Sequence, residues 1–195
     1  LLKLRQVCNH PQLLSLSSAK KVHQSAKMDY LMDVVPELIS EGRRILIFSQ
    51  FTSMLALIEA QLDKENIEYL KLTGASRNRQ ELIDTFQTGD VPVFLISLKA
   101  GGVGLNLTAA DTVIHFDPWW NPAVENQATD RAHRIGQEKP VFVYKLIVEN
   151  SIEQVIQTIQ KNKASLAKAL LSEETNETTL SLTEDIVKAM MTPLQ

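Results

Sequence analysis

Residues 127–137 (QATDRAHRIGQ) carry two arginines, Arg131 and Arg134, three positions apart. We expect this segment to be helical, and the spacing then places both guanidinium groups on one helix face. A guanidinium is planar, always charged and able to bond two oxygens at once, so the pair suits a polyphosphate. For the two arginines alone, a solvated and charged helix face is the simpler interpretation.

Two further segments contain residues that suit a ligand site. Gly101, Gly102 and Gly104 form a loop whose backbone N–H groups could approach phosphate oxygens, although a tight turn explains the same glycines. Trp119 and Trp120 lie between two prolines, which favours an irregular, exposed loop. One ring could stack on a base or sugar, and we expect the other to plug the underside of the loop.

Basic residues near these loops could contact phosphates, but each is more simply explained as a solvated side chain. They are Lys99, beside the glycines, and Arg77 and Arg79, at the start of a predicted helix. His115 lies in an apolar run and is expected to be structural. The sequence has no G-x-x-x-x-G-K-[ST] phosphate loop and no Asp-Glu pair ending a strand that would hold Mg²⁺.

The order of apolar patterns predicts strands that alternate with helices. Short continuous apolar runs, typical of buried parallel strands, predict strands at 45–48, 69–72, 91–96, 112–116 and 141–147. Helical spacing predicts helices at 1–8, 26–41, 53–65, 76–86, from 122 onward and 150–171. Residues 15–25 are expected to be a loop, 172–180 a linker and 181–191 a short helix.

Several residues are expected to begin, bend or end these helices. Pro36 should kink or restart its helix and Gly42 should end it. Ser76 and Asn121 should cap helices, and Asn150 with Glu153 resembles a capping box.

This alternation predicts an α/β fold with a parallel sheet. In such sheets ligands bind beyond the carboxyl ends of the strands. The loops beginning at Ser49, Ser97 and Asp117 all follow strand ends, so we expect them to open on one edge of the sheet.

Composition is that of an ordinary globular protein: the 195 residues are 44% hydrophobic and 22% charged. No apolar run approaches the ~20 residues of a membrane-spanning helix. The net charge of −3 argues mildly against a dedicated basic DNA-binding domain without excluding a local basic groove. Cys8 and His10 are too few ligands for zinc, so no metal site is predicted. Leu1 already begins a helical pattern, so we expect a piece of a longer protein.

Five ordered segments resemble the C-terminal motifs of the Swi/Snf-type ATPases, which belong to the superfamily-two helicase-related DNA translocases. They are 45–51 (ILIFSQF), 72–74 (LTG), 97–111 (SLKAGGVGLNLTAAD), 117–122 (DPWWNP) and 127–137. Residues 4–11 resemble the helix entering this lobe, and 151–171 resemble the closing brace helix. The resemblance covers about residues 1–171.

The resemblance implies a RecA-like parallel sheet sandwiched by helices, the helicase C-terminal lobe, with flanking N-terminal and C-terminal helices. ATP would bind between two lobes, with Mg²⁺ held by the missing N-terminal lobe. Arg131 and Arg134 match arginine fingers, which neutralise charge on the γ-phosphate in the transition state. Positions matching ATP-facing residues are Gly102, Gly104, Gln127, Arg131 and Arg134. Positions matching DNA-facing residues are Ser49, Gln50, Gly74, Ser97, Lys99, Gly101, Asn106 and Trp120.

The resemblance also implies a division of the chain and a set of partners. Residues 1–24 would be the entry helix and loop, 25–149 the RecA-like lobe, 150–171 the brace helix and 172–195 a linker with a short helix. The implied partners are double-stranded DNA, the N-terminal ATPase lobe of the same polypeptide and other proteins of the nucleic-acid machinery, with no membrane. The location would be the cytoplasm of a prokaryote or the nucleus of a eukaryote. Trp119 falls where family members vary, and residues from about 172 match no motif.

Three hypotheses follow. The first is the motor lobe of an ATP-dependent DNA translocase of the chromatin-remodelling type, inactive alone because it lacks the phosphate loop. The second is a module that binds DNA or a partner protein and never hydrolyses ATP. The third, a self-contained enzyme for a small phosphorylated ligand, needs a nucleophile or base beside the glycine loop, and the sequence offers none with convincing partners.

Overall fold

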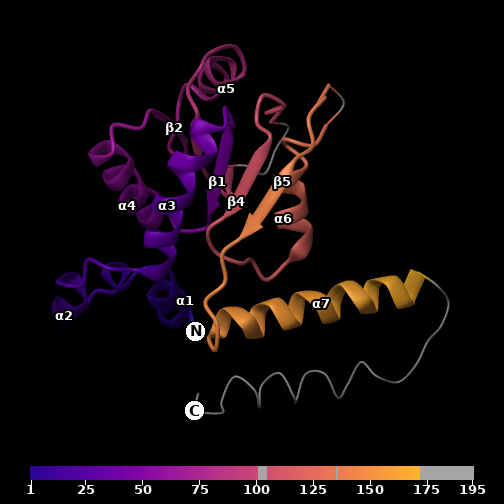
Figure 1. The fold of residues 1–195 in the computed structure, drawn as a ribbon. Coiled ribbons are helices and arrows are strands. Elements are labelled where there is room, and N and C mark those ends of the chain that lie inside the picture. Colours follow the sequence, from indigo (N-terminus) through magenta and orange to yellow (C-terminus); the bar gives the residue numbers. More distant parts are fainter. Residues whose placement is uncertain (101–104, 135, 172–195) are drawn as a thin grey trace.

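The computed structural model describes residues 1–100, 105–134 and 136–171. Gly101, Gly102 and Gly104 and the expected linker and short helix at 172–195 lie outside these ranges. The described strands form one parallel five-stranded sheet in the order β2-β3-β1-β4-β5 (Figure 1). They are β1 (Ile45–Ser49), β2 (Tyr69–Leu72), β3 (Val93–Ser97), β4 (Thr112–His115) and β5 (Phe142–Lys145). The parallel α/β fold expected from the sequence is therefore confirmed.

The described helices are α1 (Leu2–Asn9), α2 (Ser17–Lys20), α3 (Ala26–Ser40), α4 (Thr52–Lys64), α5 (Arg79–Thr88), α6 (Pro122–Thr129) and α7 (Ile152–Leu171), with a short 3₁₀ helix, η1 (Pro11–Leu13). No described helix is both long and apolar enough to cross a membrane.

The sheet separates two apolar cores because side chains along a strand alternate between its faces. In β1, Ile45 and Ile47 pack with the apolar faces of α3 and α4. Leu46 and Phe48, which alternate with them, pack with α5 and α6 on the other side. All four side chains are fully buried. Burial of each side chain contributes on the order of 1.5–3 kcal/mol relative to exposure. Strand β1 therefore lies at the centre of a three-layer fold, in the middle of the sheet and with a core on each face.

Helix α3 does not break at its proline. It runs without interruption from Ala26 to Ser40, so the helix does not restart at Pro36, and the alternative expectation of a kink there stays a prediction. Pro36 lies on the exposed side of the helix, and the buried residues Val35 and Leu38 hold the opposite side against the sheet. The expected stop at Gly42 is confirmed: its φ of 75° is left-handed, and its N–H donates to Ile39 O at 2.9 Å.

Two other helix starts differ from expectation. Helix α5 begins at Arg79, and Ser76 Oγ instead accepts from Thr73 N–H at 2.9 Å, which forms a turn. Before α7, Asn150 has a left-handed φ of 51°, and Ser151 Oγ accepts from Glu153 N–H at 3.1 Å. Ser151, rather than Asn150, is therefore the capping residue.

Of two further local expectations, one is confirmed and one differs from the structure. Asn121 caps α6 as predicted, because its side chain accepts from Ala123 N–H at 3.1 Å. The segment expected to be a loop at 15–25 contains the one-turn helix α2.

Helices α1 and α7 flank the edge of the sheet where the strands end. Figure 1 shows β5 pointing toward the start of α7, with α1 beside it. The two helices contact each other although they lie at opposite ends of the described chain. They therefore border the edge at which the parallel strands deliver their loops.

Candidate functional site

The arginine segment follows a helix instead of belonging to one. Helix α6 ends at Thr129, and Arg131 and Arg134 lie in the turns beyond it, so their expected placement on one helix face is wrong. The carbonyl of Arg131 accepts a hydrogen bond from Leu107 N–H at 3.0 Å. This contact ties the turn to the segment after the glycine loop, and the sequence spacing gave no sign of it.

The two arginines have different surroundings. Arg131 is only 4% exposed, and its buried Nε has no hydrogen-bond partner among the described residues. Arg134 is exposed and donates to Leu105 O at 3.3 Å. It lines an open cavity of about 850 Å³ with Asn106, Asp130 and His133. Arg134 can therefore reach a ligand directly, whereas Arg131 lies beneath the surface.

A third arginine, Arg79, lies close enough to Arg131 to affect its pKa. Burial lowers the pKa of Arg131, and the charges of Arg134 and Arg79 lower it further, while Asp130 raises it. Arg79 donates to Ala100 O at 2.5 Å, at the last described residue before the glycine loop. The positive charges of Arg134 and Arg79 thus both repel the buried Arg131, and an anion bound nearby would relieve that repulsion. Of these, Arg79 was considered from the sequence only as a phosphate contact, without any link to the pair.

Gln137 fastens the same turn from its far end. Its side-chain amide donates to three carbonyl oxygens: Thr108 at 3.0 Å, Ala110 at 2.6 Å and Ala132 at 3.1 Å. The turn that carries Arg134 is therefore held against the segment after the glycine loop at both ends. The sequence pattern gives no sign of this role of Gln137, because the acceptors are backbone atoms.

A second group of predicted residues lies where β1 and β4 end. Asp117 is 1% exposed and accepts from Ser49 Oγ at 2.5 Å and from Gln50 N–H at 3.2 Å. Burial raises the pKa of Asp117, and these hydrogen bonds oppose the rise. The carboxylate therefore joins the two strand-end loops.

Two serines expected to face DNA are instead internal. Ser49 is fully buried and donates to Asp117, and Ser97 is 3% exposed and accepts from Ala100 N–H at 3.3 Å. Their hydroxyls shape loops and do not reach the surface, so a direct DNA contact by either side chain is not supported. The sequence could not reveal this, because burial of a side chain depends on its neighbours in space.

The two tryptophans divide as expected. Trp119 packs against the core on the α5 and α6 side of the sheet, while Trp120 is half-buried and belongs to neither core cluster. The backbone N–H of Trp119 donates to Glu125 at 2.7 Å. Trp119 therefore packs inward as expected of one ring, and Trp120 remains half-buried outside both clusters.

The other predicted residues lie at the surface or outside the described ranges. Gly74, Lys99, Asn106 and Gln127 are exposed. Gly101, Gly102 and Gly104 cannot be placed. A Cβ built on Gly74 would meet nothing within 4 Å, so space is not what requires a glycine there.

Buried charges beneath these loops were missed from the sequence. Lys27 of α3 bonds Glu153 at 2.6 Å, with side chains 4% and 1% exposed, and also donates to Phe116 O at 2.8 Å. Burial raises the pKa of Glu125, but hydrogen bonds from Lys145, the Trp119 backbone and Gln160 outweigh it and lower the pKa overall. Charged residues are usually solvated, so nothing in the sequence pattern marked these pairs.

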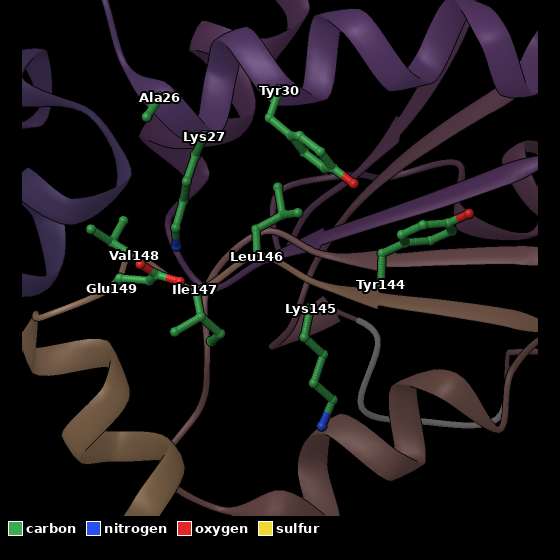
Figure 2. Close-up of a pocket in the computed structure, with 9 residues that line it drawn as sticks. All are labelled: Ala26, Lys27, Tyr30, Tyr144, Lys145, Leu146, Ile147, Val148 and Glu149. Carbon is green, nitrogen blue, oxygen red and sulfur yellow. The ribbon is translucent and has the colours of Figure 1, made fainter.

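A cavity of about 400 Å³ lies beside the Lys27 side chain. Figure 2 shows Lys27 and Tyr30 of α3 facing Tyr144 and the residues after β5. The Lys27 amine is already bonded to Glu153, Phe116 O and Asn9, so it has little capacity for a ligand. The described residues contain no group of three or more His, Cys, Asp or Glu side chains that could hold a metal ion.

The parallel sheet between two helical layers, with an arginine-bearing turn beyond α6, is the architecture of a RecA-like helicase lobe. The family model of the helicase conserved C-terminal domain matches residues 26–136, more than half of the chain. The chain belongs to this family, and its likeness to Swi/Snf-type ATPases is confirmed by its relatives.

The relatives are much longer proteins. An uncharacterized ATP-dependent helicase of Mycoplasma pneumoniae is 43% identical over 179 residues, which are 90% of this chain and 17% of that protein. The chromatin-remodeling ATPase INO80 of Saccharomyces cerevisiae is 40% identical over 166 residues, 84% of this chain and 11% of that protein. The chain thus spans less than a fifth of the length of either.

A solved structure has the same fold. The C-terminal part of the Fun30 ATPase domain matches with a TM-score of 0.68 and 38% identity, over 82% of this chain and 53% of that one.

Proposed function

We propose that this chain is the second motor lobe of a DNA-dependent ATPase that translocates on double-stranded DNA. In this proposal an N-terminal lobe of the same polypeptide binds ATP and Mg²⁺, and this lobe contributes Arg131, Arg134 and the DNA-facing loops. The ATP-dependent helicase and remodelling activities of the relatives support the general class.

The observation that carries the proposal is the turn after α6. It presents an exposed guanidinium, Arg134, in the lining of an open cavity, and the charges of Arg134 and Arg79 are close enough to lower the pKa of the buried Arg131. The chain contains no phosphate loop, so the cluster suits an anion that another lobe holds. Positive groups fixed in advance where negative charge develops are an effective form of catalysis.

The two arginines have separate roles in this mechanism. Arg134 contacts the γ-phosphate directly and neutralises charge as the bond to the leaving group breaks. Arg131, which is buried and has an unpaired Nε among the described residues, holds its charge beneath the site and supports that contact. Gln127 lies exposed near the end of α6, and Gln137 fixes the turn against residues 108–110. Mg²⁺, held by the other lobe in this proposal, would neutralise negative charge on the phosphate oxygens.

The DNA-facing part of the proposal rests on the exposed or half-exposed residues at the strand ends. Gln50, Gly74, Lys99, Asn106 and Trp120 remain candidates for contacts with the duplex, whereas the Ser49 and Ser97 side chains do not. A local set of contacts is compatible with a net charge of −3, because affinity for phosphates depends on where charges lie.

The test is the ATPase rate of a protein that carries this chain together with an N-terminal ATPase lobe, measured with and without duplex DNA. We expect turnover that duplex DNA stimulates. Duplex binding without any turnover would support the alternative of a non-hydrolysing DNA-binding module. Turnover that is indifferent to DNA would contradict the proposed translocase.

A further inference from the structure

Arg5 of α1 lies at the meeting point of the two strand-end loops. Its Nη2 donates to the side-chain oxygen of Gln50, which follows β1, and to Pro118 O, which follows β4, at 3.2 Å. Its guanidinium carbon also lies 5.9 Å from the ring centroid of Phe51 and 5.4 Å from that of Trp120. One side chain thus touches residues of both loops, including the two half-buried candidates for DNA contact, Gln50 and Trp120.

Side chains of three helices donate hydrogen bonds to three carbonyl oxygens of the loop after β4. Lys27 of α3 donates to Phe116 O at 2.8 Å, Arg5 of α1 to Pro118 O, and Gln160 of α7 to Trp119 O. Side chains from three helices outside the sheet therefore determine the path of one short loop. Of the three, only Arg5 also reaches the loop after β1.

Arg5 is not placed to touch a phosphate itself. Its side chain is 7% exposed. Burial lowers the pKa of Arg5, and the nearby Asp117 and Glu153 carboxylates oppose that shift. A guanidinium that is buried among rings and carbonyls is a scaffold for its neighbours. Its planar fork can bond two acceptors at fixed angles, which an ammonium cannot do.

We propose that Arg5 is a positioning residue for duplex DNA, one that fixes Gln50 and Trp120 relative to each other. The proposal rests on the proposed DNA-binding function of these loops. It makes helix α1, which lies outside the sheet, a determinant of DNA affinity. It also accounts for the placement of a buried arginine that has no part in ATP chemistry.

The experiment measures the dissociation constant of labelled duplex DNA across a salt series. It uses a protein that carries this chain and an N-terminal ATPase lobe, in wild-type form and as Arg5→Ala, Arg5→Lys, Gln50→Ala, Trp120→Ala and Lys3→Ala. Lys3→Ala is the matched control, because it removes an exposed positive charge from the same helix. Thermal unfolding of each variant reports folding.

We expect Arg5→Ala to weaken duplex binding about tenfold, which corresponds to about 1.4 kcal/mol of binding free energy. Arg5→Lys should cause a smaller loss, and Lys3→Ala a change of less than about twofold. Each lost phosphate contact reduces the magnitude of the slope of log K against log salt by about 0.9. The slope should therefore stay the same in Arg5→Ala, because a positioning residue makes no phosphate contact of its own. A reduced slope would identify a direct phosphate contact and overturn the positioning role.

A double variant tests the coupling. If Arg5 acts through Gln50, then Arg5→Ala combined with Gln50→Ala should weaken binding by less than the two single losses together. Additive losses would overturn the proposal.

The single variants separate this proposal from the proposed function. If Gln50→Ala and Trp120→Ala leave duplex affinity unchanged, the proposed DNA contacts fail. If both weaken binding while a folded Arg5→Ala or Arg5→Lys binds as wild type, only the role of Arg5 fails. If Arg5→Ala does not fold, Arg5→Lys decides, because it keeps the charge and loses the fork.

Discussion

At the scale of single residues, side chains of the same type differ in burial and therefore in the roles they can have. Arg131 is 4% exposed, whereas Arg134, three positions further on, lines an open cavity. Ser49 and Ser97 are drawn into the interior by hydrogen bonds, so they organise loops. Residue type indicates which chemistry is available, and accessibility decides which side chain carries it out.

For Arg134 the expected effect is on chemistry and not on folding. Arg134→Ala should lower DNA-stimulated ATP hydrolysis by about 10³-fold or more, because a finger stabilises transition-state charge. Its one described hydrogen bond is a 3.3 Å contact to Leu105 O, so the melting temperature should change little. The control is Lys139→Ala, an exposed cation in the same region. Near-wild-type turnover by Arg134→Ala would contradict the finger role.

His115 should make the fold sensitive to mild acid. Burial lowers the pKa of His115 to about 4, whereas its pKa in the unfolded chain is near 6.5. Between these pH values the imidazole is protonated in the unfolded chain and neutral in the folded chain. Stability is therefore unaffected above pH 6.5 and falls by about 1.4 kcal/mol per pH unit between 6.5 and 4. Urea unfolding at several pH values should show a shallower loss for His115→Gln, which does not titrate.

The opposite shift of Asp117 does not obscure this comparison. Its raised pKa stabilises the fold as pH falls, but it contributes equally to wild type and His115→Gln and cancels in their difference. Parallel pH profiles for the two chains would show that His115 is not the group responsible.

At the scale of elements, polar side chains from peripheral helices hold the loops at the sheet edge. Helix α3 is joined to α7 by Lys27 and Glu153, and α7 reaches the loop after β4 through Gln160. These helices pack by apolar faces, but their polar contacts fix the geometry of the site. Helix α7 therefore contacts the loop that carries Trp120 directly, through Gln160.

Breaking the Lys27–Glu153 pair should destabilise the fold strongly. In Glu153→Gln the shape and the acceptor for Val148 N–H remain, but the buried Lys27 charge loses its partner. We expect a loss of about 3–5 kcal/mol in the free energy of unfolding, measured with urea. The matched control, Glu149→Gln at an exposed position of the preceding loop, should change it by less than about 0.5 kcal/mol. A similar small effect for both variants would contradict the importance of the pair.

At the scale of the whole molecule, apolar clusters cover both faces of the described sheet, while the cavity beside the arginine turn is open. The central strands β1, β3 and β4 are buried along their whole length, whereas the edge strand β5 leaves Phe142 and Val143 exposed. Arg134 lines the open cavity, and the sequence contains no phosphate loop. In the proposed function, catalysis depends on the closure of two lobes.

This chain by itself should therefore fold cooperatively yet hydrolyse no ATP. Circular dichroism during heating checks the first expectation, and phosphate release with saturating duplex DNA checks the second. Adding a separately produced N-terminal ATPase lobe should restore some turnover, which Arg134→Ala in this chain should abolish. DNA-stimulated turnover by this chain alone would contradict the split site.

Much of the fold was predictable from local sequence, because apolar periodicity and capping act over a few residues. The five strands, the stop at Gly42 and the cap at Asn121 follow from such patterns. Errors arose where distant contacts override local preference. The arginine segment leaves the helix because Leu107 and Gln137 bind it to another segment, and α3 continues through Pro36 because its buried face is packed.

The sequence by itself determined the alternation of elements and the residue types able to bind phosphate, since both are properties of short segments. Only the tertiary structure decided which of those residues are accessible. It buried Arg131, Ser49 and Ser97, exposed Arg134, and brought Arg5 to Gln50 across 45 positions of chain. The physical reason is that burial and hydrogen bonding depend on neighbours in space, and the carboxyl edge of a parallel sheet gathers neighbours from distant parts of the sequence.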